Sequence, residues 1–111
     1  MYKQEEIEQW AQEKGIYTDP SMKKQLQGVA EEAIESMEAY TELYYSEKYA
    51  VQGEEDIYGF ELAQELGDIY VFWINACKIA GVDPKDAVDS AYFKISKRKG
   101  KTVNGRFVKN G

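Results

Sequence analysis

Apolar residues recur every three or four positions along most of the chain, which is the spacing of one face of an α-helix. Gly, Pro and Asp residues interrupt this pattern at positions where helices commonly start or end. Asp19-Pro20 and Asp83-Pro84 each pair an N-terminal capping side chain with the residue favoured at the first helical position. The sequence therefore predicts an all-α fold with helices over residues 3–14, 20–50, 55–80 and 84–99, with a break at Gln52-Gly53.

The pattern changes beyond Gly100. Asn104-Gly105 is the two-residue signal of a tight hairpin turn, and short apolar and basic stretches flank it. Two strands are marginally stable by themselves in water, so we expect this hairpin-like tail to need a partner surface. We therefore divide the chain into an all-α domain over 1–99 and a basic C-terminal tail over 100–111.

The two central helices are too long for this chain to cover alone. A helix of about 30 residues is roughly 45 Å long, whereas a compact 100-residue protein has a radius of gyration of about 13 Å. Pairing the long helices with those of another copy would bury the uncovered part. We expect a four-helix bundle completed by dimerisation, as a homodimer or a homotetramer.

Composition excludes several kinds of chemistry. The chain of 111 residues has no histidine and one cysteine, so His-based triads, imidazole zinc sites and an internal disulfide are excluded. The cysteine, Cys77, is expected to be a small core residue in a reducing compartment. Residues 1–8 lack the apolar segment of a signal peptide, and the longest apolar run, 69–74, is too short to cross a bilayer. We expect a cytoplasmic protein that has no membrane partner.

Charge is distributed unevenly along the chain. The net charge of −6 combines −13 over residues 1–89 with +7 over residues 90–111. A basic tail suggests a non-catalytic interaction protein that binds nucleic acid. The acidic body disfavours this interpretation, because it would repel a phosphate backbone beyond the reach of the tail.

Carboxylates are spaced for metal binding on the two central helices. Residues three apart share a helical face, so Glu32 and Glu35 project together, as do Glu65 and Asp68. Four carboxylates without imidazole suit a hard cation, Mg²⁺ first and Mn²⁺ second. A solvated acidic helix face gives the same pattern, but the apolar run over 69–74 indicates that the second pair is partly buried. From the residues alone both interpretations stay open.

The two acidic motifs resemble those of the MazG-like nucleoside triphosphate pyrophosphohydrolases, an all-α superfamily. The resemblance covers about residues 5–99 and rests on the order Glu31-Glu32-xx-Glu35, Glu65-Leu66-Gly67-Asp68 and an apolar helix. It extends to Ala80-Gly81-Val82-Asp83-Pro84 before a basic helix. The resemblance implies hydrolysis of a nucleoside triphosphate to the monophosphate and pyrophosphate. It further implies that Glu32, Glu35, Glu65 and Asp68 hold Mg²⁺ and that Glu31 is the catalytic base.

An acidic site that takes a triphosphate also needs cations. Lys94 and Arg98 lie four apart on the expected fourth helix and are candidate phosphate ligands, although partners of surface glutamates are an equal alternative. Trp10, Phe72 and Trp73 are candidates for stacking on a base, although such residues are more often core. Within the same superfamily, dUTP, dCTP and phosphoribosyl-ATP are alternative substrates that the sequence does not separate.

Overall fold

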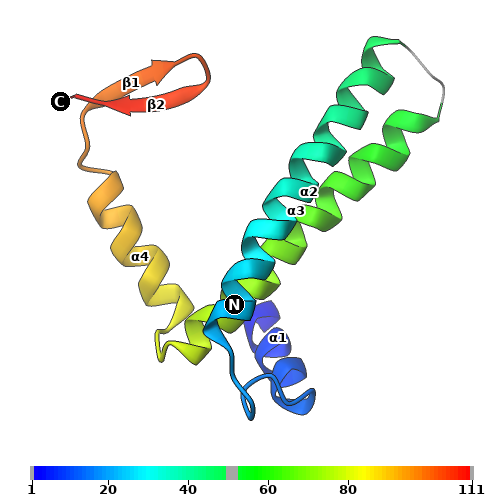
Figure 1. Ribbon diagram of the computed structural model, residues 1–111. Coiled ribbons are helices and arrows are strands. Elements are labelled where there is room, and N and C mark those ends of the chain that lie inside the picture. Colours follow the sequence, from blue (N-terminus) through cyan, green and yellow to red (C-terminus); the bar gives the residue numbers. More distant parts are fainter. Residues whose placement is uncertain (1, 50–52, 111) are drawn as a thin grey trace. The chain divides into compact units, whose positions relative to one another are not determined.

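The computed structural model describes residues 2–49 and 53–110, and these residues are mostly helical. Its elements are α1 (Tyr2–Glu13), α2 (Met22–Lys48), α3 (Glu54–Ile79), α4 (Pro84–Ile95), β1 (Gly100–Val103) and β2 (Arg106–Lys109), as drawn in Figure 1. The predicted all-α fold with a C-terminal hairpin is confirmed. Part of the predicted break at Gln52-Gly53 lies outside the described residues. Within the described part of the chain, no helix is both long enough and apolar enough to span a membrane.

The start of α2 differs from the prediction. Ser21, not Asp19, caps the helix, and its Oγ accepts a hydrogen bond from the backbone N–H of Lys24 at 3.2 Å. Asp19 is held in the turn after α1, because its N–H donates to the carbonyl of Gly15 at 3.2 Å. The assignment of Asp19-Pro20 as the helix start was therefore wrong, since the preceding turn extends further than the Asp-Pro signal indicates.

The fourth helix starts as predicted but ends early. The Asp83 side chain accepts a hydrogen bond from the N–H of Lys85 at 2.8 Å, and Pro84 is in the first turn. The helix ends at Ile95 rather than at residue 99. Ser96 and Lys97 form a turn, and the Lys99 carbonyl accepts the N–H of Asn110 at 2.7 Å, so the chain has already left the helix where it joins the hairpin.

The chain divides into two compact units, Met1–Gly81 and Val82–Gly111. The first contains α1, α2 and α3, and the second contains α4 and the β1–β2 hairpin. In the hairpin, Val103 pairs with Arg106 across a two-residue turn. Asn104 (φ 51°) and Gly105 (φ 79°) both have positive φ, as the tight turn predicted from this dipeptide requires.

Small residues bring α2 and α3 together. Four residues of α2 are buried: Gly28, Ser36, Ala39 and Ser46. The two hydroxyls return to their own helix, since Ser36 Oγ donates to the Glu32 carbonyl and Ser46 Oγ to the Leu43 carbonyl, each at 2.8 Å. A Cβ at Gly28 would overlap the ring of Phe72. The absence of a side chain there permits the close approach of the two helices.

The C-terminal part of α3 packs against α1. Ala11, Ile74 and Asn75 are almost fully buried, and Cys77 is buried as predicted. The Tyr17 hydroxyl donates to the Asn75 Oδ1 at 2.8 Å, which satisfies a polar side chain in this apolar environment. This packing fixes α3 against α1 at one end and against α2 along its length.

Gly28→Ala is expected to destabilise the chain by about 1–2 kcal/mol, because overpacking against Phe72 outweighs the better helix propensity of alanine. Urea unfolding followed by circular dichroism measures the change. Gly59→Ala is the matched control: it lies in α3, nothing lies within 4 Å of its added Cβ, and a gain of up to about 1 kcal/mol is expected. Equal effects of the two substitutions would contradict the proposed role of Gly28.

Candidate metal centre

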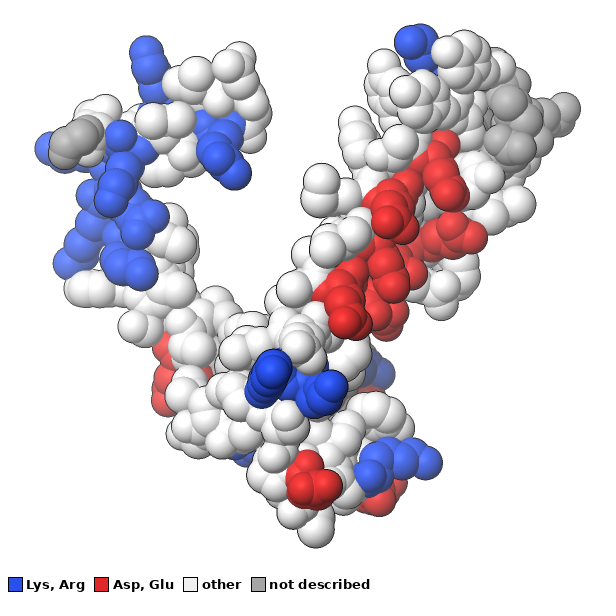
Figure 2. Space-filling model, in the orientation of Figure 1, with Lys and Arg blue, Asp and Glu red and all other residues white. Residues whose placement is uncertain are grey.

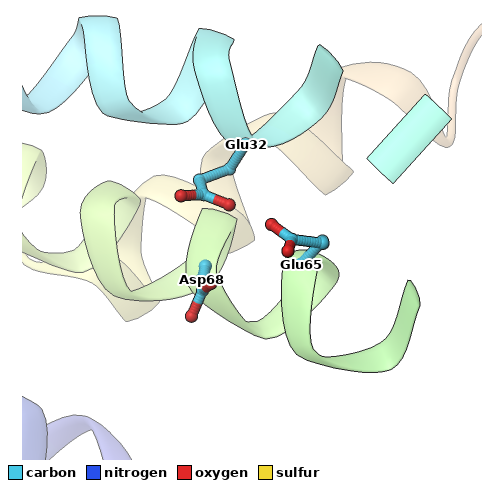
Figure 3. Close-up of side chains that lie close together, drawn as sticks. All are labelled: Glu32, Glu65 and Asp68. Atoms are coloured by element: carbon cyan, nitrogen blue, oxygen red, sulfur yellow. The ribbon is translucent and has the colours of Figure 1, made fainter. Parts of the chain in front are cut away.

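Three carboxylates converge between α2 and α3. Glu32 comes from α2, whereas Glu65 and Asp68 come from α3. One oxygen from each of these side chains lies within 4.8 Å of the others. In Figure 3 the carboxylates of Glu32 and Glu65 point toward each other across the space between the helices. The predicted juxtaposition of the two acidic motifs is thus present for three of the four proposed ligands.

The local sequence explains how Glu32 reaches this position. Gly28, Glu32 and Ser36 are four residues apart, so they form one line along the face of α2 that packs on α3. The small residues on either side of Glu32 are buried and allow α3 to approach. The glutamate side chain is therefore directed into the helix interface, where one turn of α3 presents Glu65 and Asp68.

The two facing glutamates lack partners for their buried oxygens. Oε2 of Glu32 and Oε2 of Glu65 are buried, and neither accepts a hydrogen bond. The pKa of Glu32 rises to about 8, chiefly because a proton shared with the Glu65 carboxyl would form a hydrogen bond between them. Burial and the neighbouring Glu35 carboxylate raise this pKa further. Near neutral pH the centre thus favours binding a positive charge, either a proton or a cation.

Glu35 lies beside this centre rather than within it. It is exposed and lines an acidic groove of about 260 Å³ together with Glu38, Ala39, Glu42, Glu61 and Glu65. Figure 2 shows acidic side chains gathered along the α2–α3 pair. The sequence analysis did not include Glu38 and Glu42 in the site. Their spacing of three and seven residues from Glu35 places them on the same side of the helix and could have identified them.

Glu31 is not brought into the carboxylate cluster. It is exposed on α2, and the group of converging oxygens does not include it. Consecutive helical residues point about 100° apart, so Glu31 and Glu32 cannot both face α3. Its role as a catalytic base stays a prediction.

Oxygen donors of this kind match a hard divalent cation. All three converging groups are carboxylates, and two of them have buried oxygens without a hydrogen-bond donor. Mg²⁺ and Mn²⁺ bind such oxygens, whereas softer metals favour sulfur or imidazole ligands. No lysine or arginine lines the acidic groove among the described residues. The residues therefore fit a divalent cation.

Lys94 and Arg98 belong to the second unit. Lys94 is in the last turn of α4, and the N–H of Arg98 donates to the Ile95 carbonyl at 3.0 Å just after the helix. Both side chains are exposed. Neither forms an ion pair with another described residue of the second unit, and residues 82–111 contain no glutamate. The alternative that they pair with surface glutamates therefore stays open. Contact with phosphate stays a prediction.

Of the three candidate base-stacking residues, Trp10 is the most exposed. It is 46% exposed and lines an apolar groove of about 340 Å³ with Ile7, Val71 and Glu6. Phe72 and Trp73 are half-buried. Of the candidates, Trp10 is thus the most accessible to a flat ligand.

Comparison of the chain with protein-family models, with curated proteins and with solved structures gave no match. The site is therefore interpreted from its own geometry.

The cation-free chain is expected to lose stability as the pH rises from about 5 to about 8. The folded-state pKa of Glu32, about 8, lies above its ordinary value of 4.5, so the folded chain binds this proton more tightly than the unfolded chain. Stability is fully present below the lower pKa and decreases toward the higher one. Urea unfolding at several pH values, in the presence of a chelator, measures this slope.

Glu32→Gln should reduce the slope, because an amide cannot ionise. Glu13→Gln, on the exposed side of α1, is the control and should leave the slope unchanged. An identical pH dependence of stability in the wild type and in Glu32→Gln would contradict the raised pKa proposed for Glu32.

Proposed function

We propose that the chain is a divalent-cation-dependent pyrophosphohydrolase, which cleaves a nucleoside triphosphate to the monophosphate and pyrophosphate. The observation that carries this proposal is the convergence of Glu32, Glu65 and Asp68 within 4.8 Å between two helices. The uncompensated buried oxygens of two of these residues support a cation as the missing partner. The resemblance of the two acidic motifs to MazG-like enzymes supports the choice of reaction.

Glu32, Glu65 and Asp68 would hold Mg²⁺, or Mn²⁺ in its place, with Glu35 at the edge of the same groove. When bound, such a cation neutralises phosphate oxygens and makes the phosphorus more electrophilic. Glu32 and Glu65 are half-buried between α2 and α3, which restricts the orientation of their carboxylates before substrate arrives and lowers the entropic cost of positioning it.

Glu31 is the proposed base. Its carboxylate would accept a proton from the attacking water as the new bond to the α-phosphorus forms. The bond from the α-phosphorus to the bridging oxygen breaks at the same centre, and pyrophosphate leaves. Glu31 directly precedes Glu32 on α2, and its exposure leaves it accessible to water.

Lys94 and Arg98 would neutralise negative charge on the phosphates of the substrate, which the carboxylates of the acidic centre cannot do. The planar guanidinium of Arg98 suits two phosphate oxygens at once, whereas the Lys94 ammonium acts as a point charge. Both are exposed and have no acidic partner among the described residues, so both are available to an anion.

The substrate class within this reaction needs a direct assay. A panel of nucleoside triphosphates, dUTP, dCTP and phosphoribosyl-ATP with Mg²⁺ or Mn²⁺ would identify it. Release of the monophosphate and pyrophosphate is expected, whereas release of a diphosphate and phosphate would contradict the proposed bond cleavage.

The second candidate function is nucleic-acid binding by the basic C-terminal segment. Its seven basic residues are exposed and form no ion pair with the described residues: Lys94, Lys97, Arg98, Lys99, Lys101, Arg106 and Lys109. Salt-dependent DNA binding that is lost on removal of residues 100–111, together with no triphosphate turnover, would favour this function over hydrolysis.

Asp68→Ala and Glu35→Ala are each expected to abolish cation-dependent pyrophosphate release, by at least about 100-fold in kcat, if the carboxylates hold the cation that positions the substrate. A coupled pyrophosphate assay measures the rates. Glu13→Ala is the control, since it removes an exposed carboxylate of α1 and should retain full activity. Near-wild-type activity of the two site variants would contradict the proposed centre.

Arg98→Ala is expected to raise KM for the triphosphate by roughly tenfold, because a charged hydrogen bond to phosphate contributes about 1.5–3 kcal/mol. Lys85→Ala is the control, as it removes a cation from the first turn of α4. Steady-state kinetics of the two variants separate the effects. An unchanged KM for Arg98→Ala would contradict phosphate binding by this residue.

A further inference from the structure

The contact between Gly28 and Phe72 lies beside the candidate metal centre on both helices. On α2, Gly28 is one helical turn before Glu32, on the line that packs against α3. On α3, Phe72 is one turn after Asp68. Each helix therefore carries one member of this contact and, one turn away, a carboxylate of the centre.

The contact is stiff because it joins the backbone of one helix to the stem of an aromatic side chain on the other. A Cβ at Gly28 would overlap Cδ1 and Cε1 of Phe72 and would lie 2.7 Å from its Cγ, whereas ordinary van der Waals contact begins at 3.4 Å. Rotation of the ring about the Cβ–Cγ bond leaves Cγ in place, so this rotation cannot relieve the overlap. At this point the backbone of α2 rests directly on the ring.

Small residues on the other side of Glu32 allow the helices to stay close there as well. Ser36 and Ala39 are buried against α3, and the Ser36 hydroxyl donates to the carbonyl of its own helix at Glu32. The separation of the helices at Glu32 is thus held between the contact of Gly28 with the ring on one side and small side chains on the other.

Cations of different size need different separations of the oxygens that hold them. Two oxygens on opposite sides of Mg²⁺ are roughly 4.1 Å apart, and those around Ca²⁺ are roughly 4.6–5.2 Å apart, since each separation is twice the metal–oxygen distance. Mg²⁺ also tolerates less departure from its ideal geometry. The converging oxygens of Glu32, Glu65 and Asp68 lie within 4.8 Å of one another. A small change in helix separation therefore decides which ion fits.

We propose that the contact between Gly28 and Phe72 is a spacer, which sets the separation of α2 and α3 at the centre and so raises the affinity for Mg²⁺ relative to that for Ca²⁺. Glu32 is carried by α2, whereas Glu65 and Asp68 are carried by α3, so the distance across the centre follows the distance between the helices. Gly28 and Phe72 act through these carboxylates and are positioning residues. The inference rests on the proposed function, because it requires the cation which that function uses.

Calorimetric titration of the full chain with Mg²⁺ and, separately, with Ca²⁺ tests the spacer. Gly28→Ala should lower the ratio of the Mg²⁺ affinity to the Ca²⁺ affinity by roughly tenfold, because carboxylates that are further apart fit the larger ion. A general loss of stability would weaken the binding of both ions and leave this ratio unchanged. Gly59→Ala, the same substitution at an open position of α3, is the control and should keep the wild-type ratio.

Two further variants separate spacing from other effects of the substitution. Phe72→Ala in the Gly28→Ala background removes the ring that the new Cβ meets, so the double variant should recover most of the wild-type ratio. Phe72→Trp enlarges the spacer from the other helix and should lower the ratio as Gly28→Ala does. Circular dichroism at the titration temperature measures the folding of each variant.

The outcomes distinguish the spacer from the centre itself. Wild-type binding of Mg²⁺ together with an unchanged ratio in Gly28→Ala and Phe72→Trp, or with no recovery in the double variant, would overturn the spacer alone. Absence of binding of either ion by the wild type would overturn the proposed cation-dependent function, and the spacer with it.

Discussion

The close approach of α2 and α3 is the constraint on which the rest of the first unit depends. Gly28 lies against the ring of Phe72, and the buried small residues of α2 continue the same line. Glu32 belongs to that line, so the packing that holds the helices together also forces its carboxylate against Glu65. A side chain that would be solvated on an isolated helix thereby becomes half-buried, with a pKa of about 8 and no donor for one oxygen. Packing and site chemistry therefore have the same origin.

Three faces of the α2 helix have different roles. One face packs on α3 through small residues, a second carries the glutamates of the acidic groove, and a third carries large apolar side chains such as Leu26, Met37 and Tyr40. The second unit has a different character, because α4 and the hairpin carry exposed cations and Pro84 is its buried residue among those described.

Periodicity and capping residues identified the four helices, and Asn104-Gly105 identified the hairpin. The capping signal gave the wrong start for α2 at Asp19-Pro20, because a hydrogen bond from the N–H of Asp19 to the Gly15 carbonyl extends the preceding turn. The i, i+3 rule brought Glu65 and Asp68 together but did not separate Glu32, which faces α3, from Glu35, which lines the groove. That distinction depends on which face of α2 packs, and small residues rather than large apolar ones define this face. Apolar periodicity therefore could not locate it.

Calorimetric titration of the purified chain with Mg²⁺ or Mn²⁺ near pH 7, in two buffers of different ionisation enthalpy, tests the central claim most directly. A cation that displaces the proton crowded between Glu32 and Glu65 should bind with release of protons, because the pKa of Glu32 is about 8 without it. Glu32→Gln should bind more weakly and release almost no protons. Absence of cation binding, or equal binding and proton release by the wild type and Glu32→Gln, would contradict a carboxylate metal centre between α2 and α3.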